Sequence, residues 1–510
     1  MPHLRDWVFA RKTVQLLSLA GFVALFVASR LAAGGAAIDL PFQLDPLIVV
    51  ASSIASRTIV VGSALALATV VLTLVFGRAW CGWLCPLGTT FDLLPSRSWR
   101  RAVAVPESWR GIKYVLLVVV LVAAVLGSQT PMFLDPLAIL TRTLGAAVWP
   151  GVDQLVTAIE GLASQVGLDG PVSSFDSLVR PALLPVDPLS YEDGPIFGAL
   201  FVGLVALNWF APRFWCRYLC PLGGLLGVIS RVALVRRTTP AACGDCRLCA
   251  MRCPTGTIDR AHDNASDPAE CTVCMECVRS CPRGLSGFRR VVAAPQGRPY
   301  DPSRRSVLVG IGAAVAGIML FRADLLAKRE SPFLLRPPGS REANADPVAL
   351  TACTRCNACV RVCPTGAIQP AVLQAGLEGF ATPVIVPRLG YCDYSCNACG
   401  LVCPTQAIPA LDLPLKQRQV IGRAYIDQNR CLVWSDNTQC VVCQEMCPVP
   451  DKAIKLEVRQ VQASDGTTPT LQFPRVDRDL CIGCGTCEYR CPVSGDAAIR
   501  VYVPGLPAAL

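Results

Sequence analysis

Six cysteine motifs, each ending in Cys-Pro, carry the clearest chemical signal in this 510-residue sequence. Four have the spacing C-x2-C-x2-C-x3-C-P; the fourth motif along the chain has one extra residue after its first cysteine, and the fifth has eight residues before its second. A loop with a cysteine at every third residue can wrap three thiolates around one iron–sulfur cubane, while the proline holds the fourth cysteine toward a neighbouring cluster. The motifs therefore predict six [4Fe–4S] clusters. Their cysteines are Cys243, Cys246, Cys249 and Cys253; Cys271, Cys274, Cys277 and Cys281; Cys353, Cys356, Cys359 and Cys363; Cys392, Cys396, Cys399 and Cys403; Cys431, Cys440, Cys443 and Cys447; and Cys481, Cys484, Cys487 and Cys491.

Zinc and disulfide bonds are the alternative uses of so many cysteines. Structural zinc is held by two paired-cysteine knuckles rather than by three closely spaced cysteines followed by Cys-Pro. Disulfide-stapled folds are typically small and secreted, whereas this chain is long. Both alternatives are therefore disfavoured.

The first two motifs predict one compact ferredoxin unit in which the fourth ligands are exchanged. One cluster would be held by Cys243, Cys246, Cys249 and Cys281, and the other by Cys271, Cys274, Cys277 and Cys253. The last four motifs predict a four-cluster module. Their spacing leaves open whether neighbouring motifs pair or whether outer pairs with outer and inner with inner.

Two further cysteine pairs lie in residues 80–88 (WCGWLCPLG) and 215–223 (WCRYLCPLG), each after an apolar run. The four-residue spacing places both sulfurs of a pair on one helical face. The proline ends that helix and can begin the next, whose positive N-terminus favours a thiolate. Cys81, Cys85, Cys216 and Cys220 could therefore form a seventh metal or cluster site. A thiol–disulfide couple and ordinary packing cysteines are the alternatives.

The composition indicates a membrane protein, with 52% apolar residues, 16% charged residues and a positive mean hydropathy. The only histidines are His3 and His262, and no Cys-x-x-Cys-His occurs, which excludes paired-histidine membrane haem and c-type haem. The formal net charge is +10. Six oxidised cubanes would add roughly −12, since four thiolates on one core leave about −2 each. The basic residues therefore give no reason to expect a nucleic-acid partner.

Four apolar runs, residues 13–29, 58–76, 114–134 and 194–212, are each long enough to cross a bilayer as a helix. Basic residues gather before the first run, between the second and third, and after the fourth, whereas 131–193 holds mostly acidic charges. The positive-inside rule then places both ends of this four-helix unit in the cytoplasm and 131–193 in the periplasm.

A fifth apolar run follows Ser303-Arg304-Arg305-Ser306-Val307-Leu308, which resembles a twin-arginine export signal. That route carries proteins already folded around their cofactors, which suits a periplasmic iron–sulfur module. At 15 residues, the run 307–321 is short for a span, so a buried helix or a linker is the alternative.

The expected fold class is multi-domain: an α-helical transmembrane bundle plus α+β ferredoxin-like 4Fe-4S modules. We expect a four-helix transmembrane domain at 1–235 and a cytoplasmic two-cluster ferredoxin domain at 236–300. A signal anchor or fifth transmembrane helix at 301–322 and a linker at 323–347 would lead to a periplasmic four-cluster domain at 348–510. The protein would then be a multi-pass protein of the bacterial cytoplasmic (inner) membrane.

By these motifs the chain resembles a fusion of two proteins of the periplasmic nitrate reductase electron-transfer system. Residues 1–300 resemble the NapH family, with four membrane helices, two Cys-x3-Cys-Pro motifs and a cytoplasmic two-cluster ferredoxin. Residues 301–510 resemble the MauM/NapG family, with a twin-arginine leader, a Leu-Arg-Pro-Pro-Gly segment and four clusters. The resemblance implies quinol oxidation at the membrane and delivery of electrons to a periplasmic acceptor.

No glycine-rich nucleotide loop and no flavin attachment motif is found, and no catalytic residue is predicted. We expect an electron conduit between the quinone pool and periplasmic or membrane oxidoreductase subunits, in contact with membrane lipid. The residues of the quinol site are not predicted. The alternatives are a maturation factor that supplies electrons for building another enzyme's cofactor, as the MauM relatives suggest, and a docking subunit.

Overall fold

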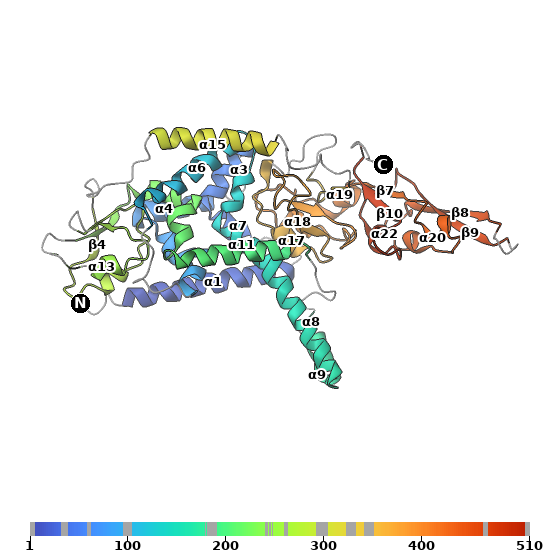
Figure 1. Cartoon of the computed structure of the whole chain (residues 1–510), viewed down its shortest axis with the longest axis horizontal. Helices are drawn as coiled ribbons and strands as arrows, with labels where there is room; N and C mark the ends of the chain where they lie inside the picture. Colours follow the sequence, from blue (N-terminus) through green and yellow to red (C-terminus); the bar gives the residue numbers. More distant parts are fainter. Residues whose placement is uncertain are drawn as a thin grey trace. The chain divides into compact units, whose positions relative to one another are not determined.

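The computed structural model describes residues 6–31, 39–58, 63–94, 105–178, 180, 191–239, 243, 246, 248–259, 264–291, 304–322, 333–340, 351–462 and 468–504. Ser303 and most of the expected linker lie outside these residues. The chain divides into two compact units (Figure 1). The first comprises residues 1–28, 37–143 and 196–320, and the second comprises 29–36, 144–195 and 321–510.

The first unit is mainly helical. Its α-helices are α1 (Asp6–Leu31), α2 (Asp39–Gln43), α3 (Pro46–Ser56), α4 (Ser63–Phe76), α5 (Pro86–Leu93), α6 (Ile112–Val125), α7 (Pro136–Thr143), α11 (Gly194–Ala206, which begins in the second unit), α12 (Pro221–Ser230), α13 (Leu248–Met251), α14 (Glu276–Arg279) and α15 (Arg304–Arg322). Two π-helical turns, Trp80–Leu84 and Trp215–Leu219, precede α5 and α12. Short 3-10 helices at Glu107–Gly111, Thr130–Leu134 and Leu207–Trp209 complete it.

Two helices of the first unit begin in the same way, at an Asp-Pro-Leu sequence. The side chain of Asp45 accepts hydrogen bonds from the backbone N–H groups of Leu47 (2.8 Å) and Ile48 (3.3 Å) at the start of α3. Asp135 does the same for Leu137 (2.9 Å) at the start of α7. Aspartate satisfies the free N–H groups of a first turn, and proline tolerates its first position. The repeated start is typical of two related halves.

The apolar runs form helices, but only two helices among the described residues are long and apolar enough to cross a membrane, Trp7–Ser29 and Ser108–Val125. The expected run 114–134 is not one helix, because α6 ends at Val125 and a 3-10 helix begins at Thr130. Shorter apolar helices lie at Pro46–Ser56, Ala64–Phe76, Gly194–Trp209, Pro221–Ser230 and Val307–Leu320. A transmembrane bundle therefore stays a prediction.

The segment that follows the twin arginines is the helix α15, which lies beside α6 (Figure 1). At Gly310 the two helices approach closely. A β-carbon there would lie 3.3 Å from Cγ1 of Val118 and 3.5 Å from Cγ1 of Val115. Glycine permits this approach because it has no side chain.

The cysteine-rich part of the first unit is built from short helices and hairpins. Strand β1 (Val235–Thr238) pairs antiparallel with β4 (Gly287–Arg290), and β2 (Ile258–Asp259) pairs with β3 (Ala265–Ser266). Helices α13 and α14 carry Cys249 and Cys277 between these strands. This α+β arrangement agrees with the expected ferredoxin-like module.

The second unit combines two helices of the segment 144–195 with the C-terminal cysteine-rich module. Its helices are α8 (Trp149–Gln165), α9 (Asp169–Leu178), α17 (Ala358–Val362), α18 (Ala398–Leu401), α19 (Leu413–Arg418), α20 (Leu432–Ser435), α21 (Val442–Glu445) and α22 (Thr486–Tyr489), with a π-helical turn at Leu144–Val148. Its strands pair antiparallel as β5 (Ile368–Pro370) with β6 (Pro383–Ile385), β7 (Arg423–Ile426) with β10 (Ile499–Tyr502), and β8 (Ile454–Gln460) with β9 (Thr470–Val476).

One apolar core joins the parts of the second unit. It contains Leu335 of the Leu-Arg-Pro-Pro-Gly segment, Val360 of α17, Ile454 of β8 and Ile499 of β10, together with cluster-motif cysteines. Leu335 also accepts a backbone hydrogen bond from Ile385 (2.9 Å), so the segment adds to the β5–β6 hairpin. This core therefore packs around cysteines from all four motifs of the C-terminal module.

Candidate iron–sulfur sites

The sixteen motif cysteines of the second unit gather into four sets of four, and each set combines three cysteines of one motif with the fourth cysteine of the neighbouring motif. Three of the sets each line a cavity. The members of the remaining set lie close enough to interact electrostatically. The sets are Cys353, Cys356, Cys359 and Cys403 (set A); Cys392, Cys396, Cys399 and Cys363 (set B); Cys481, Cys484, Cys487 and Cys447 (set C); and Cys431, Cys440, Cys443 and Cys491 (set D). Neighbouring motifs therefore pair, which the spacing alone left open.

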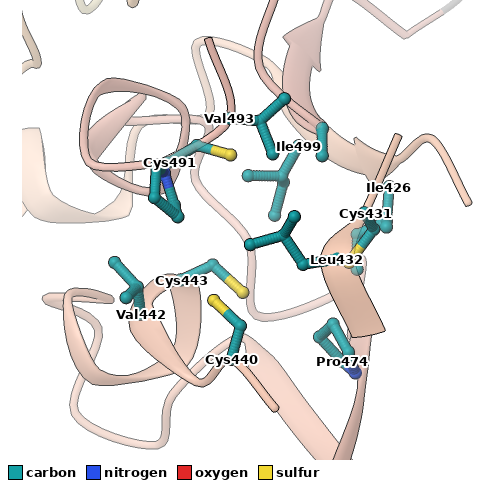
Figure 2. Close-up of a pocket in the computed structure, with 12 residues that line it drawn as sticks. Ile426, Cys431, Leu432, Cys440, Val442, Cys443, Pro474, Cys491, Val493 and Ile499 are labelled. Carbon is teal, nitrogen blue, oxygen red and sulfur yellow. The ribbon is translucent and has the colours of Figure 1, made fainter. Parts of the chain in front are cut away.

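Set D shows how a widely spaced motif still forms a site (Figure 2). Its four cysteines lie around one cavity whose other walls are apolar, with Leu432 and Ile499 among them. The eight residues between Cys431 and Cys440 contain α20, where Trp434 donates a backbone hydrogen bond to the carbonyl of Cys431 (2.8 Å). The insertion turns back on itself, so both cysteines reach the same cavity.

The four sets follow one another in single file. Cys359 of set A lies close enough to Cys399 of set B for their charges to interact. The backbone N–H of Cys392 in set B donates a 2.8 Å hydrogen bond to the carbonyl of Cys484 in set C. The contacts place the sets in the order A, B, C, D, because Cys487 of set C is likewise close to Cys443 of set D. In the sequence, by contrast, three cysteines of set D precede all four of set C, and Cys491 follows them.

The surroundings of the sulfurs suit thiolate ligands of an iron–sulfur core. Backbone N–H groups donate to Sγ of Cys353 (3.3 Å, from Arg355), Cys403 (3.4 Å, from Ile408) and Cys481 (3.3 Å, from Ala424). Such bonds tune cluster potentials.

Burial, with a smaller contribution from neighbouring thiolates, raises the pKa of Cys359 well above its ordinary value. A bound cation or cluster opposes that effect by stabilising the thiolate. Among the described residues, no three Cys, His, Asp or Glu side chains converge closely enough to hold a single metal ion. The sulfurs line cavities instead, and four sulfurs within apolar walls fit a cubane.

The two motifs of the first unit also exchange a ligand. Cys253 of the first motif lies close to Cys271 and Cys274 of the second. Cys249 lies near Cys243 and also near Cys277, so the two predicted sites adjoin. The set of Cys271, Cys274, Cys277 and Cys253 is therefore brought together as expected. For the other set, Cys246 and Cys281 stay predicted ligands.

The two Cys-x3-Cys-Pro motifs come together in the first unit, as the sequence suggested. All four cysteines are buried, and the charges of Cys216 and Cys81 act on both Cys85 and Cys220. Each motif is a π-helical turn followed by a proline that begins a helix. The sulfur of Cys85 accepts a hydrogen bond from Gly88 N (3.5 Å), and that of Cys220 from Gly223 N (3.2 Å). The two first-turn N–H groups therefore stabilise negative charge on both sulfurs.

Two buried arginines cross between these motifs, and the sequence interpretation missed them. Arg78 donates to the carbonyl of Cys216 (3.4 Å), and Arg213 donates to the carbonyl of Cys81 (3.3 Å). Each arginine stands three residues before the first cysteine of its own motif, in the shared pattern R-x-W-C-x-x-L-C-P-L-G. The arginine that recurs in both motifs is the sequence feature from which these contacts could have been predicted. The arginine of each motif therefore bonds to a carbonyl of the other motif, and the two hydrogen bonds connect the motifs reciprocally.

The ferredoxin loop of the first unit rests directly on the first Cys-x3-Cys-Pro motif. The indole of Trp83 donates to the carbonyl of Val273 (3.0 Å), and Arg78 donates to that of Ala269 (3.1 Å). Gly82 is required at this contact, because a β-carbon there would lie 2.0 Å from the carbonyl oxygen of Thr272. The Cys271 set and the four-cysteine site therefore lie next to each other.

A buried ion cluster holds the same loop. The carboxylate of Glu270 accepts hydrogen bonds from Nζ of Lys113 (2.5 Å) and pairs with Arg78 (3.5 Å). Burial alone would raise the pKa of Glu270, but the charges of Lys113 and Arg78 lower it below its ordinary value. The carboxylate is therefore ionised and fixes the residue before Cys271.

Comparison with known proteins supports this assignment of the cysteines. Residues 58–102 and 194–240, which contain both Cys-x3-Cys-Pro motifs, match a family described as "4Fe-4S binding domain". Residues 352–407 match a "4Fe-4S dicluster domain", in agreement with the pairing of the third and fourth motifs, and residues 473–499 match a further "4Fe-4S binding domain". No solved structure is significantly similar to the chain.

Several characterised proteins share one part of the chain. The methylamine utilization ferredoxin-type protein MauM of Methylorubrum extorquens is 37% identical over 211 residues, which are 40% of this chain and 90% of that protein. The ferredoxin-type protein NapG of Escherichia coli is 34% identical over 211 residues, 41% of this chain and 87% of NapG. MauM of Paracoccus denitrificans is 33% identical over 204 residues, with 39% and 87% covered. Over about 40% of its length, the chain therefore belongs to the family of ferredoxin-type proteins that includes MauM and NapG.

Proposed function

We propose that the protein is a membrane-bound electron carrier that passes electrons from quinol to a periplasmic oxidoreductase through [4Fe–4S] clusters. The single-file order of sets A to D carries this proposal. A row of neighbouring clusters suits the movement of electrons between partners that are too far apart for one cluster to reach both. The contact between Cys392 and Cys484 joins the two halves of that row.

Six clusters would occupy the six motif-derived sets. We further propose that Cys81, Cys85, Cys216 and Cys220 hold a seventh cluster, because they are buried together and two N–H groups already donate to their sulfurs. The contact of Trp83 with Val273 would then keep this site next to the Cys271 set.

The proposed topology places residues 236–300 in the cytoplasm and 323–510 in the periplasm of a bacterium. The candidate spans Trp7–Ser29 and Ser108–Val125 support membrane insertion. The Arg304–Arg305 pair at the start of α15 and the packing of Gly310 against Val118 support an export helix that joins the helical unit. On this proposal the first 300 residues act as a NapH-type partner fused to the MauM/NapG-type part.

Reduction of the purified full-length protein by a quinol tests this function. With its clusters assembled, the protein should bleach in the visible range when mixed with decylubiquinol, and dithionite should add little further bleaching. An oxidised spectrum that persists with the quinol but bleaches with dithionite would refute the quinol donor. Iron and acid-labile sulfide counts on the same sample establish how many clusters are present.

A second candidate is a maturation factor that delivers electrons during the assembly of another enzyme's cofactor, a role that is compatible with the similarity to a methylamine utilization ferredoxin-type protein. The two candidates differ in cells that lack the chain. A carrier's partner would be isolated with its cofactors complete but without electron supply, whereas a maturation target would be isolated with an incomplete cofactor.

A further inference from the structure

A cavity of about 300 Å³ lies within the first unit, between its N-terminal helix and its cysteine-rich module. Its walls include Arg11 and Leu16 of α1, Asp92 and Leu93 of α5, and Glu276 at the start of α14. None of these residues belongs to the cysteine sites described above. The volume is at the lower end of that of small-molecule pockets.

The inner part of this cavity is polar. Arg11 is only 5% exposed; its guanidinium pairs with Glu276 (3.3 Å) and Asp92 (3.9 Å), and its Nε has no hydrogen-bond partner. Gln15, which is 4% exposed, donates to Asp92 (2.9 Å) and to the carbonyl of Gly82 (2.9 Å). Two carboxylates and a buried guanidinium therefore face one space. Asp92 is itself held by Arg213 (2.7 Å). Glu276 can accept a hydrogen bond from a ligand hydroxyl, and Arg11 can donate to a ligand carbonyl.

The cavity adjoins a predicted cluster through the backbone. Pro254, which lines it, directly follows Cys253, and Glu276 stands between Cys274 and Cys277. These three cysteines belong to one predicted set. Arg11 is close enough to Cys274 for their charges to interact. A ligand in the cavity would therefore be separated from the cluster only by the loop that binds it.

The outer part of the cavity contains exposed apolar side chains beside the exposed Lys12, and it lies on a candidate membrane helix. Leu16 and Leu93 are 50% and 57% exposed at its edge, and α1 contains the candidate span Trp7–Ser29. An occupant should therefore have a polar, redox-active head for the inner groups and an apolar tail for the surface of α1. These are the properties of a membrane quinol.

We propose that this cavity is the quinol-binding site, with Arg11, Asp92 and Glu276 around the quinol head and Leu16 and Leu93 against its ring and tail. This proposal rests on the proposed function and adds the residues at which the quinol would bind. In the reaction the quinol loses two electrons and two O–H protons and becomes the quinone. One electron would go to each of the two clusters that the cysteines of residues 236–300 would hold, and the protons would leave to water through the open side of the cavity.

The test uses the full-length protein with its clusters assembled, reconstituted in lipid nanodiscs. A fluorescent hydroxyquinoline-N-oxide inhibitor reports binding by quenching, and stopped-flow absorbance reports cluster reduction by decylubiquinol. Leu16→Trp fills the cavity without removing a polar contact. Leu17→Trp is the matched control, because Leu17 is the next residue of the same helix, 66% exposed, and does not line the cavity. Glu276→Gln provides a second variant that keeps the side-chain size and removes a carboxylate.

Leu16→Trp should weaken inhibitor binding at least tenfold, or by roughly 1.4 kcal/mol, and slow reduction by the quinol in proportion. Leu17→Trp should change neither, and dithionite should bleach all variants equally. If Leu16→Trp and Glu276→Gln bind the inhibitor and accept electrons as the wild type does, the quinol binds elsewhere. The assignment of the cavity as its binding site is then wrong, while the proposed oxidation of quinol stands. If the wild type neither binds the inhibitor nor accepts electrons from the quinol, the quinol function itself fails, and the cavity with it.

Discussion

The backbone N–H of Cys392 donates a 2.8 Å hydrogen bond to the carbonyl of Cys484, a residue 92 positions later in the chain (484 − 392). The bond joins the fourth motif to the sixth and so links set B, built from the third and fourth motifs, to set C, built from the fifth and sixth. Burial is the largest cause that raises the pKa of Cys392, to about 12, and Cys484 is among the neighbouring charges that contribute. The two sites therefore share an electrostatic environment as well as a backbone contact.

The single-file order predicts which reduced clusters couple magnetically. Cys484→Ala should remove the set C cluster, so that the set B and set D clusters both lose a paramagnetic neighbour. The electron paramagnetic resonance spectrum of the dithionite-reduced protein should then become markedly simpler, with narrower signals from the remaining clusters.

Cys440→Ala is the matched control for this experiment, because set D lies at the end of the row. Cys440→Ala should remove the set D cluster, so that only the set C cluster loses a magnetically coupled neighbour. Each variant should lose about four irons. Equal spectral changes in the two variants would contradict the order A, B, C, D.

The four buried cysteines of the Cys-x3-Cys-Pro motifs make a second prediction, on metal content. Six cubanes require about 24 irons, and a site between these motifs would add to that number or bind another metal. Cys81→Ser with Cys216→Ser should lower the total metal content and remove one spectroscopic component, while the six other clusters stay assembled. Unchanged metal analysis and spectra would leave these cysteines as thiols.

The buried ion cluster around Glu270 predicts a large effect on stability. Glu270→Gln leaves Lys113 and Arg78 as buried charges without a counterion, which typically costs about 3–5 kcal/mol. We expect a clearly lower thermal midpoint for the first unit, followed by tryptophan fluorescence and by loss of cluster absorbance in the full-length protein.

Glu457→Gln is the control, measured on the thermal midpoint of the second unit, which contains β8. Glu457 also pairs with two cations, Arg459 (2.5 Å) and Arg475 (2.9 Å), but its side chain is 41% exposed. Exposed pairs contribute roughly 0–1 kcal/mol. A thermal midpoint that falls equally in both variants would show that burial does not set the cost.

The export proposal predicts where two reporters are active. A reporter fused after residue 290 should be active in the cytoplasm, and one fused after residue 345 in the periplasm. Replacement of Arg304 and Arg305 by Lys should abolish the periplasmic signal at 345 and keep the cytoplasmic signal at 290, because the export pathway reads the arginine pair. Cytoplasmic activity at 345 in the unmodified chain would contradict a split location of the two modules.

The local chemistry of the sites could be predicted from the sequence because it depends on near neighbours. Three closely spaced cysteines followed by Cys-Pro specify a cluster-binding loop wherever they occur. The 4Fe-4S families matched at 352–407 and 473–499 agree with that interpretation. The relation to MauM and NapG was also visible, since it rests on motif spacing. Apolar runs predicted helices, but not where each one ends: the run 114–134 is interrupted because α6 stops at Val125.

The cysteine spacing predicts which cysteines are cluster ligands, whereas only the folded chain shows which of them come together. The fourth cysteine of each motif leaves its own loop, so its partner depends on how two loops pack and not on spacing. Cys491 reaches Cys431 and Cys443, and Cys403 reaches Cys353, because the loops and hairpins of the module pack against one another around apolar cores. The crossing of Arg78 and Arg213 has the same cause. Each guanidinium finds its acceptor more than 130 residues away, since the two related halves fold against each other.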